Sequence, residues 1–434
     1  MRWRWLVVLC ACGSSHDAID GAPATDAAID AAVDAAPDAM PDAPPPMCTV
    51  SGALDPSFIG APVFSMTNAA AAATAVDASG RIVVVGGTYL EGSPGAVVRY
   101  QSDGSLDPTF GSGGVVRYYN GGYGVDLGGV VIQPDGKIIA VGTSVATILP
   151  DEGDVIVLRY LTDGSLDPAF GTDGVGLAHI GDLAGANGVV LDGDGRIVVS
   201  VSIEIGDNDP DYMSAARFTA DGALDPTFGT DGFAPSLYAG RFTGATGVAL
   251  DSHGDILTSG IADDQEPLAA QLAAVRYTPD GALDDTFTVH SMYPDGGGGF
   301  GVLVDGDAVV VVGGDNVHAV LARFLADGSP DPAFDGVVNV DGGFLGAVLA
   351  PGGGYYGAGT DGPGNIAKAF ITRLDASGAV DPAFGVTITA TTHQATFVNG
   401  MTIQADGKPI IVGETIDGNG DTYTGDFYIA RYCP

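Results

Sequence analysis

Apolar and polar residues alternate along short segments that end at tight turns, and this arrangement recurs along most of the chain. In one clear copy, residues 129–133, 137–142, 154–160 and 174–178 read as strands, with Asp-Gly turns after the first and third. Asp and Gly accept the positive φ of tight turns, so the pattern indicates antiparallel hairpins. Four strands in each unit of about 47 to 60 residues predict the blades of a β-propeller. A solenoid is the structural alternative, but solenoid coils are usually much shorter.

A fixed spacing marks the units: an Arg, an Asp eight residues later and a Phe three residues after that. The complete copies are Arg99/Asp107/Phe110, Arg159/Asp167/Phe170, Arg217/Asp225/Phe228, Arg276/Asp284/Phe287, Arg323/Asp331/Phe334 and Arg373/Asp381/Phe384. A seventh copy is split, with Asp55 and Phe58 near the start and Arg431 near the end. A ring needs such a split when both ends of the chain build one blade.

We therefore predict an all-β fold, a seven-bladed β-propeller of four-stranded antiparallel blades. The N- and C-terminal segments close the ring in one blade, where a strand near residues 61–65 completes the part formed by residues 397–432. Eight residues let the chain turn back from the third strand, so each Arg should meet its Asp within one blade, and Arg431 should meet Asp55. Arg suits a partly buried bidentate pair, and we expect these pairs to be structural. The Phe of each copy should pack between blades.

Three copies share the pattern Asp-Gly-x-Leu-Asp-Pro-x-Phe, at residues 103–110, 163–170 and 221–228. This pattern resembles the delta-60 repeat family, which occurs in tandem in exported bacterial proteins, and the resemblance covers about residues 52–434. Later copies depart from it at Asp285, Pro330 and Ser377. The family has no settled biochemical activity, so the resemblance implies a fold and export and adds little about function.

The charge balance narrows the possible partners. The chain has 54 acidic and 16 basic residues, a net charge of −38, and 68 glycines among 434 residues. Such a surface repels phosphate, so we expect no nucleic-acid partner and no binding to anionic lipid headgroups. It would attract metal cations or basic molecules, although a solubilising role explains it more simply.

The N-terminus predicts export and anchoring. Residues 1–11 have a basic start and a short apolar run, as in a lipoprotein signal peptide. The segment Leu9-Cys10-Ala11-Cys12 resembles a bacterial lipobox, and Cys12 is the expected lipidation site. Residues 12–47 begin with that Cys and continue as Ala, Asp and Pro, which predicts a disordered tether. Residues 48–434 form the propeller, and we expect it to be held at the outer membrane of the cell envelope by the lipid.

Two cysteines lie just outside the segments that close the ring, Cys48 and Cys433. In an exported protein they predict a disulfide, and two free thiols are the alternative. The bridge would close a loop of nearly the whole domain, which the chain-entropy model values at about 4–5 kcal/mol.

Candidate chemistry lies in the loops between second and third strands, which should share a face with the blade-to-blade connections. Acidic stretches occur there at residues 151–154, 207–211, 263–266 and 417–421. The last resembles the start of a calcium loop through Asp417, Asn419 and Asp421, but Thr422 and Tyr428 replace the expected Gly and Glu. We therefore expect no cofactor: the simpler interpretation is a solvated acidic loop, and calcium bound by these residues is the alternative.

Other candidates are weaker. His179, His290 and His393 fall in or near blade connections and could bind zinc, but they follow their Phe by nine, three and nine residues without a shared motif. Arg117 and Arg241 could hold an anion. The chain has no nucleophile elbow, zinc-protease motif or phosphate loop, and both tryptophans, Trp3 and Trp5, belong to the signal.

These features predict a monomeric, lipid-anchored, non-enzymatic binding scaffold that uses its acidic variable loops to bind a protein or small molecule. One alternative is a hydrolase or lyase acting on extracellular polymers with carboxylates in the central funnel. Another is a purely structural envelope protein.

Overall fold

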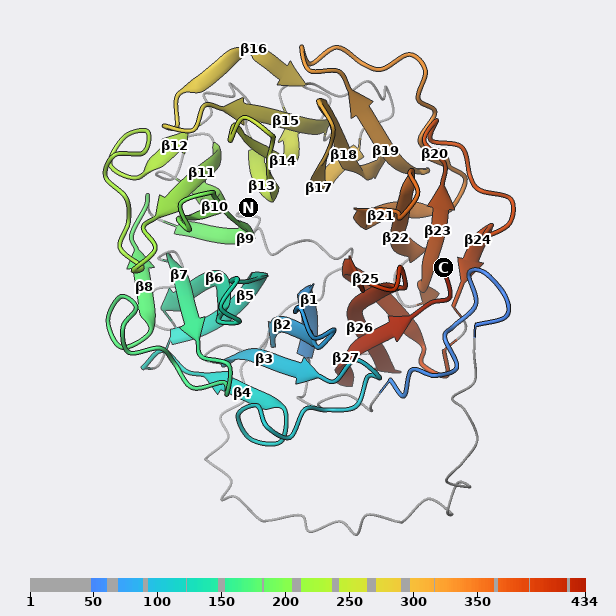
Figure 1. Cartoon of the computed structure of the whole chain (residues 1–434), viewed down its shortest axis with the longest axis horizontal. Helices are drawn as coiled ribbons and strands as arrows, with labels where there is room; N and C mark the ends of the chain where they lie inside the picture. The colour runs from blue at the N-terminus through green and yellow to red at the C-terminus, as the bar shows by residue number, and fades with distance from the viewer. Residues whose placement is uncertain are drawn as a thin grey trace.

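The structure, a computed structural model, is a ring of blades around a central axis (Figure 1). It describes residues 48–60, 69–88, 93–121, 123–146, 153–181, 183–204, 212–235, 242–263, 271–289, 297–315, 317–362, 366–389, 391–419 and 422–434. Six blades have four antiparallel strands, and the seventh has three described strands. A single parallel bridge between Gly153 and Leu183 joins the second and third blades into one sheet. The predicted all-β, seven-bladed propeller is confirmed.

Strands follow one another outward from the axis, so that blade 1 is β1 to β4 and blade 7 begins at β25. The innermost strands are β1 (Ala69–Val76), β5 (Tyr123–Ile132), β9 (Leu183–Leu191), β13 (Phe242–Leu250), β17 (Gly297–Asp305), β21 (Gly342–Leu349) and β25 (Ala395–Ile403). The second strands are β2 (Ile82–Thr88), β6 (Ile138–Ala146), β10 (Ile197–Glu204), β14 (Ile256–Asp263), β18 (Ala308–Asp315), β22 (Tyr355–Asp361) and β26 (Pro409–Asn419).

The third strands are β3 (Gly95–Tyr100), β7 (Gly153–Tyr160), β11 (Tyr212–Phe218), β15 (Gln271–Tyr277), β19 (Ala319–Phe324), β23 (Lys368–Leu374) and β27 (Thr422–Arg431). The outermost strands are β4 (Val115–Tyr118), β8 (Val175–Ala178), β12 (Phe233–Pro235), β16 (Leu283–Val289), β20 (Val337–Val338) and β24 (Val386–Ile388). No helix in the described part of the chain is long and apolar enough to cross a membrane.

The core lies between blades, because each blade buries both of its faces. Strand β6 shows how: successive residues of a strand point to opposite sides, and in β6 both sides are apolar. Ile139 and Val141 pack with residues of blade 3, whereas Ile138 and Ala140 pack with residues of blade 1. Strands in the middle of a blade, such as β6, therefore need apolar residues at successive positions. A strand that buries only one face needs apolar residues only at alternate positions.

The ring closes in blade 7, where residues 48–60 lie beside the C-terminal residues (Figure 1). Leu54 forms an antiparallel bridge with Tyr432, and the Asp55 N–H donates to the Arg431 carbonyl at 2.8 Å. The predicted disulfide joins Cys48 to Cys433, 385 residues apart, with their Cα atoms at 5.4 Å. The expected strand near residues 61–65 lies outside the described residues.

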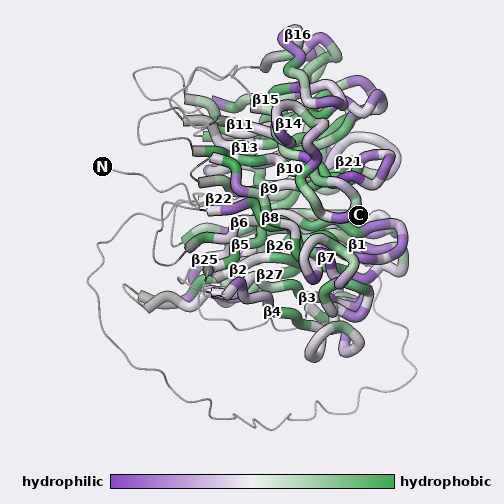
Figure 2. Tube along the Cα trace, turned by 90° about the vertical axis from the view of Figure 1, so that its left-hand side faces the viewer, coloured by the Kyte–Doolittle hydropathy of each residue, from purple (hydrophilic) through white to green (hydrophobic). Residues whose placement is uncertain are grey.

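The ring has two faces, which Figure 2 shows from the side. We call one the hairpin face: it carries the turns between first and second and between third and fourth strands, such as 77–81 and 101–110. The connection face carries the loops between second and third strands and the segments that join one blade to the next. Hydrophilic turns crowd the hairpin face, on the right of Figure 2.

Candidate functional site

The repeated Arg and Asp meet on the hairpin face. In blades 1, 2, 3 and 7 the Nε–Oδ2 distance is 2.8 or 2.9 Å, and both side chains are at most 9% exposed. In these four blades the guanidinium carbon also lies 4.5 to 4.7 Å from the ring centre of the motif Phe. Blade 7 assembles its pair from the two ends of the chain, as Arg431 with Asp55.

Six of the seven motif Arg residues also donate to a carbonyl of the next blade, which the sequence spacing did not reveal. The Nη1 atom of Arg99 donates to the Thr162 carbonyl at 2.5 Å, and that of Arg159 donates to the Ala220 carbonyl at 2.8 Å. The motif Phe follows the same direction: a Cβ on Gly222 would lie 2.7 Å from the Phe170 ring, so only glycine fits there. The Arg, Asp and Phe therefore fasten blades to one another, in addition to the expected pair within a blade.

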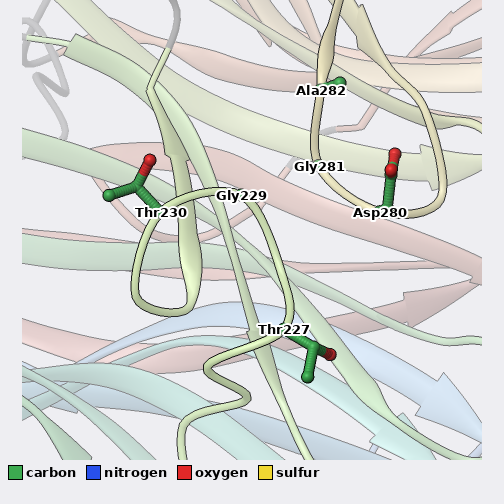
Figure 3. A pocket seen from close by; sticks show the side chains of 6 residues that line it. All are labelled: Thr227, Gly229, Thr230, Asp280, Gly281 and Ala282. Atoms are coloured by element: carbon green, nitrogen blue, oxygen red, sulfur yellow. The ribbon is translucent and has the colours of Figure 1, made fainter.

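The hollow in Figure 3 belongs to this fastening. It holds about 330 Å³ between blades 3 and 4 and is lined by Thr227, Gly229, Thr230, Asp280, Gly281 and Ala282. The Gly229 N–H donates to the Asp280 carbonyl at 2.8 Å, and Gly111 and Gly171 make the same bond to their next blades. The hollow thus lies where two copies of the repeat meet, and its backbone contact is the one that recurs between other blades.

The connection face carries three His–Asp pairs, each in a different part of the ring. The Nδ1 atoms lie 2.8, 3.0 and 2.6 Å from carboxylate oxygens in the pairs His179–Asp154, His318–Asp315 and His393–Asp417. Each histidine thus has its own carboxylate, and the predicted candidates His179 and His393 are not brought together. His290 and Arg241 lie outside the described residues. Sequence reasoning missed His318, although its spacing three residues after Asp315 in a short loop was a signal.

The calcium candidate is only partly described. Asp417 accepts from the His393 ring and, at 2.9 Å, from the Gln394 N–H. The hydrogen bond from His393 lowers the pKa of the Asp417 carboxyl, so it is ionised at neutral pH. Asn419 ends β26, and its side chain and Asp421 lie outside the described residues. One oxygen-bearing ligand of the predicted set is therefore placed, already holding two donors.

Among the described residues, three potential metal ligands come within 4.8 Å of one another at one place, Cys48, Asp55 and Cys433. The two sulfurs are bonded to each other as the disulfide, and Asp55 pairs with Arg431. This group is therefore a structural closure and not a metal centre.

A groove opens on the connection face between blades 5 and 6. It holds about 540 Å³, and its lining combines aliphatic and acidic side chains: Val317, His318, Asn339, Val340, Asp341, Asp361, Val386 and Ile388. The Asp361 carboxylate accepts from the Asp341 N–H at 2.8 Å, which fixes it beside the segment that joins blade 5 to blade 6. None of the described residues that line it is a Lys or Arg. Sequence reasoning missed this site because its residues come from four separate segments.

The central axis is lined by the innermost strands, and each of these strands has one bulge. Three bulged polar residues bond to the next blade: Asn187 to the Ala245 carbonyl at 2.6 Å, Thr246 to the Gly299 carbonyl at 2.8 Å and Asn399 to the Ala71 carbonyl at 2.9 Å. On β5, Asp126 is exposed to solvent, but the surrounding strands desolvate its carboxyl and raise its pKa.

Comparisons with known proteins address the fold. A family model described as a "Domain of unknown function (DUF5122) beta-propeller" matches residues 78–110, 133–170, 193–228 and 302–334. Each matched segment ends at the Phe of a repeat. A search of curated proteins found no match.

Solved structures match this chain at low sequence identity. A protein of unknown function from Dyadobacter fermentans is 12% identical, with 86% of this chain and 97% of that chain covered and a TM-score of 0.48. An α-L-arabinofuranosidase from Fusarium graminearum is 10% identical, with 84% and 92% covered and a TM-score of 0.46. A putative 6-phosphogluconolactonase from Bacteroides uniformis is 13% identical, with 83% and 94% covered and a TM-score of 0.43. The family model and the seven-bladed ring together fit a β-propeller repeat family.

Proposed function

We propose that this protein is a lipid-anchored binding scaffold of the cell envelope, which holds a partner on its connection face and catalyses no reaction. The observation that supports this proposal is the difference between the two faces. The hairpin face repeats one set of contacts from blade to blade, whereas the connection face carries features that change from blade to blade, including the groove between blades 5 and 6. Variable surface on a constant frame is where binding sites are usually placed.

The anchor is part of the proposal. Acyl chains on Cys12 would hold a monomeric ring at the outer membrane, and residues 13–47 would space it from the bilayer. Replacing Cys12 with Ser should move the protein from the membrane fraction to the soluble fraction of fractionated cells. Retention of the C12S protein in membranes would contradict the lipid anchor.

Binding is tested with the full chain as bait for native envelope proteins, with calcium and with a chelator, followed by cross-linking and peptide mapping. We expect cross-links on the connection face. Cross-links on the hairpin face, or no specific partner in either condition, would contradict the scaffold and favour a purely structural role. A partner that is lost with the chelator would support calcium at Asp417, Asn419 and Asp421, where carboxylate and amide oxygens suit this ion.

One observation favours the alternative of a hydrolase or lyase acting on extracellular polymers. A carboxyl with a raised pKa suits general acid or base chemistry, and Asp126 offers one at the central axis. The test is release of new chain ends from cell-wall polysaccharides by the full chain, with Asp126→Asn as the variant. Activity that disappears in D126N but persists in Asp307→Asn, on the hairpin face, would support the enzyme over the scaffold.

A further inference from the structure

Resting on the proposed scaffold function, we propose that the groove between blades 5 and 6 binds an extended, lysine- or arginine-bearing peptide segment of a partner protein. The segment adds a strand to the outer edge of β24. Three properties of the groove support this: an open strand edge, aliphatic side chains beside that edge, and carboxylates with no Lys or Arg among the described lining residues.

The open edge follows from the hydrogen-bond pattern of blade 6. Strand β24 is the last strand of its sheet, and the Thr389 N–H donates to the Ala369 carbonyl at 2.8 Å. In an antiparallel ladder, alternate residues turn their backbone groups toward the partner strand. Thr387 and Thr389 therefore face β23, and the N–H and C=O groups of Val386 and Ile388 point outward. Peptides recognised by strand addition pair with groups of this kind.

The aliphatic part of the groove lies beside that edge. Val386 and Ile388 are 39% and 51% exposed, and both line the groove together with Val317 and Val340. Side chains two residues apart on a strand share a face, so an added strand would lay alternate side chains against these valines and the isoleucine. Small aliphatic residues at alternate positions of the peptide fit this surface.

Charge selects the remaining positions of the peptide. Asp341 and Asp361 line the groove, and Asp315 lies beside it, bonded to His318. Lys368 begins the neighbouring strand β23, but its Nζ atom donates to the carbonyls of His393 and Gln394 toward blade 7. The carboxylates therefore face the groove without a lysine, and a net charge of −38 disfavours a second copy of the chain as the occupant. A cationic segment is the complementary partner.

The test measures fluorescence anisotropy of a labelled octapeptide in which lysine and valine alternate, with the full chain. Octapeptides of alternating glutamate and valine, and of lysine and proline, are the probe controls. We expect binding of the lysine–valine peptide only, weaker at high salt because exposed charges are screened.

Two matched pairs of variants locate the site. Ile388→Pro removes an outward N–H without unpairing β23, since Pro is tolerated at such edge positions, and should weaken binding about tenfold. Its control is Leu177→Pro, on the outward-facing side of β8, where Leu177 is 48% exposed. Asp361→Asn keeps an acceptor for the Asp341 N–H but removes the charge, and should weaken binding about threefold. Its control is Asp307→Asn.

Several results would overturn the proposal: equal effects of I388P and L177P, equal binding of the glutamate peptide, or a concentration-dependent dimer that I388P converts to monomer. Circular dichroism and the melting temperature establish that each variant folds. Repeating the envelope pull-down with I388P as bait distinguishes a failure of the groove proposal from a failure of the scaffold proposal. If I388P still captures the envelope partners but no longer binds the labelled peptide, the partners bind elsewhere; this groove is then refuted and the scaffold proposal stands. If the unmodified chain captures no partner, the scaffold proposal itself is refuted.

Discussion

The motif Arg–Asp pairs are not equally buried around the ring. In what we call the tight half, blades 7, 1, 2 and 3, the motif Arg and Asp side chains are at most 9% exposed. In the loose half, blades 4, 5 and 6, the exposed fractions are 15% to 29%. The Arg323–Asp331 and Arg373–Asp381 distances lengthen to 3.6 and 3.1 Å.

A second cation accounts for the difference. Directly before the second strand, three blades of the tight half place Arg81, Lys137 or Lys408, which lie 3.8, 3.1 and 2.9 Å from the motif Asp of the same blade. Blade 3 has Arg196 there, whose charge interacts with Asp225. The corresponding residues of blades 4, 5 and 6 are Asp255, Asp307 and Gly354. The long stem of a Lys or Arg covers the pair as well as adding charge, and the loose half has neither.

The loose half is also where the groove lies. Blades 5 and 6 combine the longer, more exposed Arg–Asp pairs with the open edge of β24 and the acidic lining of the groove. Departure from the repeat thus coincides with the candidate site, which is the expected relation when constant residues serve the frame and variable ones serve binding.

Opening the ring should have the largest effect on stability. Replacing Cys48 and Cys433 with Ser should lower the free energy of unfolding by about 4–5 kcal/mol, because the bridge restrains a loop of nearly the whole domain in the unfolded state. Denaturant titration measures this, and hydrogen exchange should speed up in blades 7 and 1 before blade 5. Reductant should destabilise the natural chain and leave the double variant unchanged. A loss below about 1 kcal/mol would show that the tight half needs no covalent closure.

The same substitution in both halves tests the comparison directly. Arg99→Met should cost about 3–5 kcal/mol, because Asp107 is left buried with one distant cation, Arg81. Arg373→Met should cost at most about 1 kcal/mol, because its pair is partly exposed to water. Guanidinium denaturation at one pH compares the two. Equal losses would remove the distinction between the halves.

Acid should weaken the tight half progressively. Burial disfavours the Asp225 carboxylate, but hydrogen bonds from Thr227 and the Arg217 guanidinium outweigh it, and the pKa lies below the usual 3.8. Such a group contributes its full stability above its unfolded pKa and loses it as the pH falls toward the folded one. The urea midpoint should therefore fall steadily below about pH 4.

Asp225→Asn should flatten that acid slope, since the variant no longer titrates at this position. The control is Asp335→Asn, the same change at an exposed position outside the tight half, which should leave the slope unchanged. If the urea midpoint of D225N falls with pH as steeply as that of the natural chain, protonation of other groups causes the acid destabilisation.

Supplying the missing cation should have the smallest effect, and it should stabilise. Burial, followed by repulsion from Asp251, raises the pKa of Asp255, so its charge is unfavourable in the folded state at neutral pH. Asp255→Lys should gain about 0.5–1 kcal/mol and place an amine beside Asp284. The gain should shrink as the pH falls toward 3.8, because the natural Asp255 becomes neutral in the folded protein at a higher pH than in the unfolded chain. Asp335→Lys makes the same charge change at an exposed position; an equal gain there would point to net charge alone.

The sequence predicted what the repeat determines. The spacing from Arg99 to Asp107 indicated the pair, the copies indicated seven blades, and the split between Asp55 and Arg431 indicated the closure. It did not predict the bond from Arg99 to Thr162, because residues 63 positions apart meet only through the stacking of blades. The groove was not predicted for the same reason: Val317 and Ile388 lie in different blades and line one groove only because those blades stack.

The contacts that six motif Arg residues make with the next blade continue across the place where the two chain ends meet. Arg431 reaches the Ser102 carbonyl of blade 1 just as Arg99 reaches Thr162 of blade 2. A circular permutant that joins the adjacent residues Cys48 and Cys433, and starts in another blade, would keep these contacts.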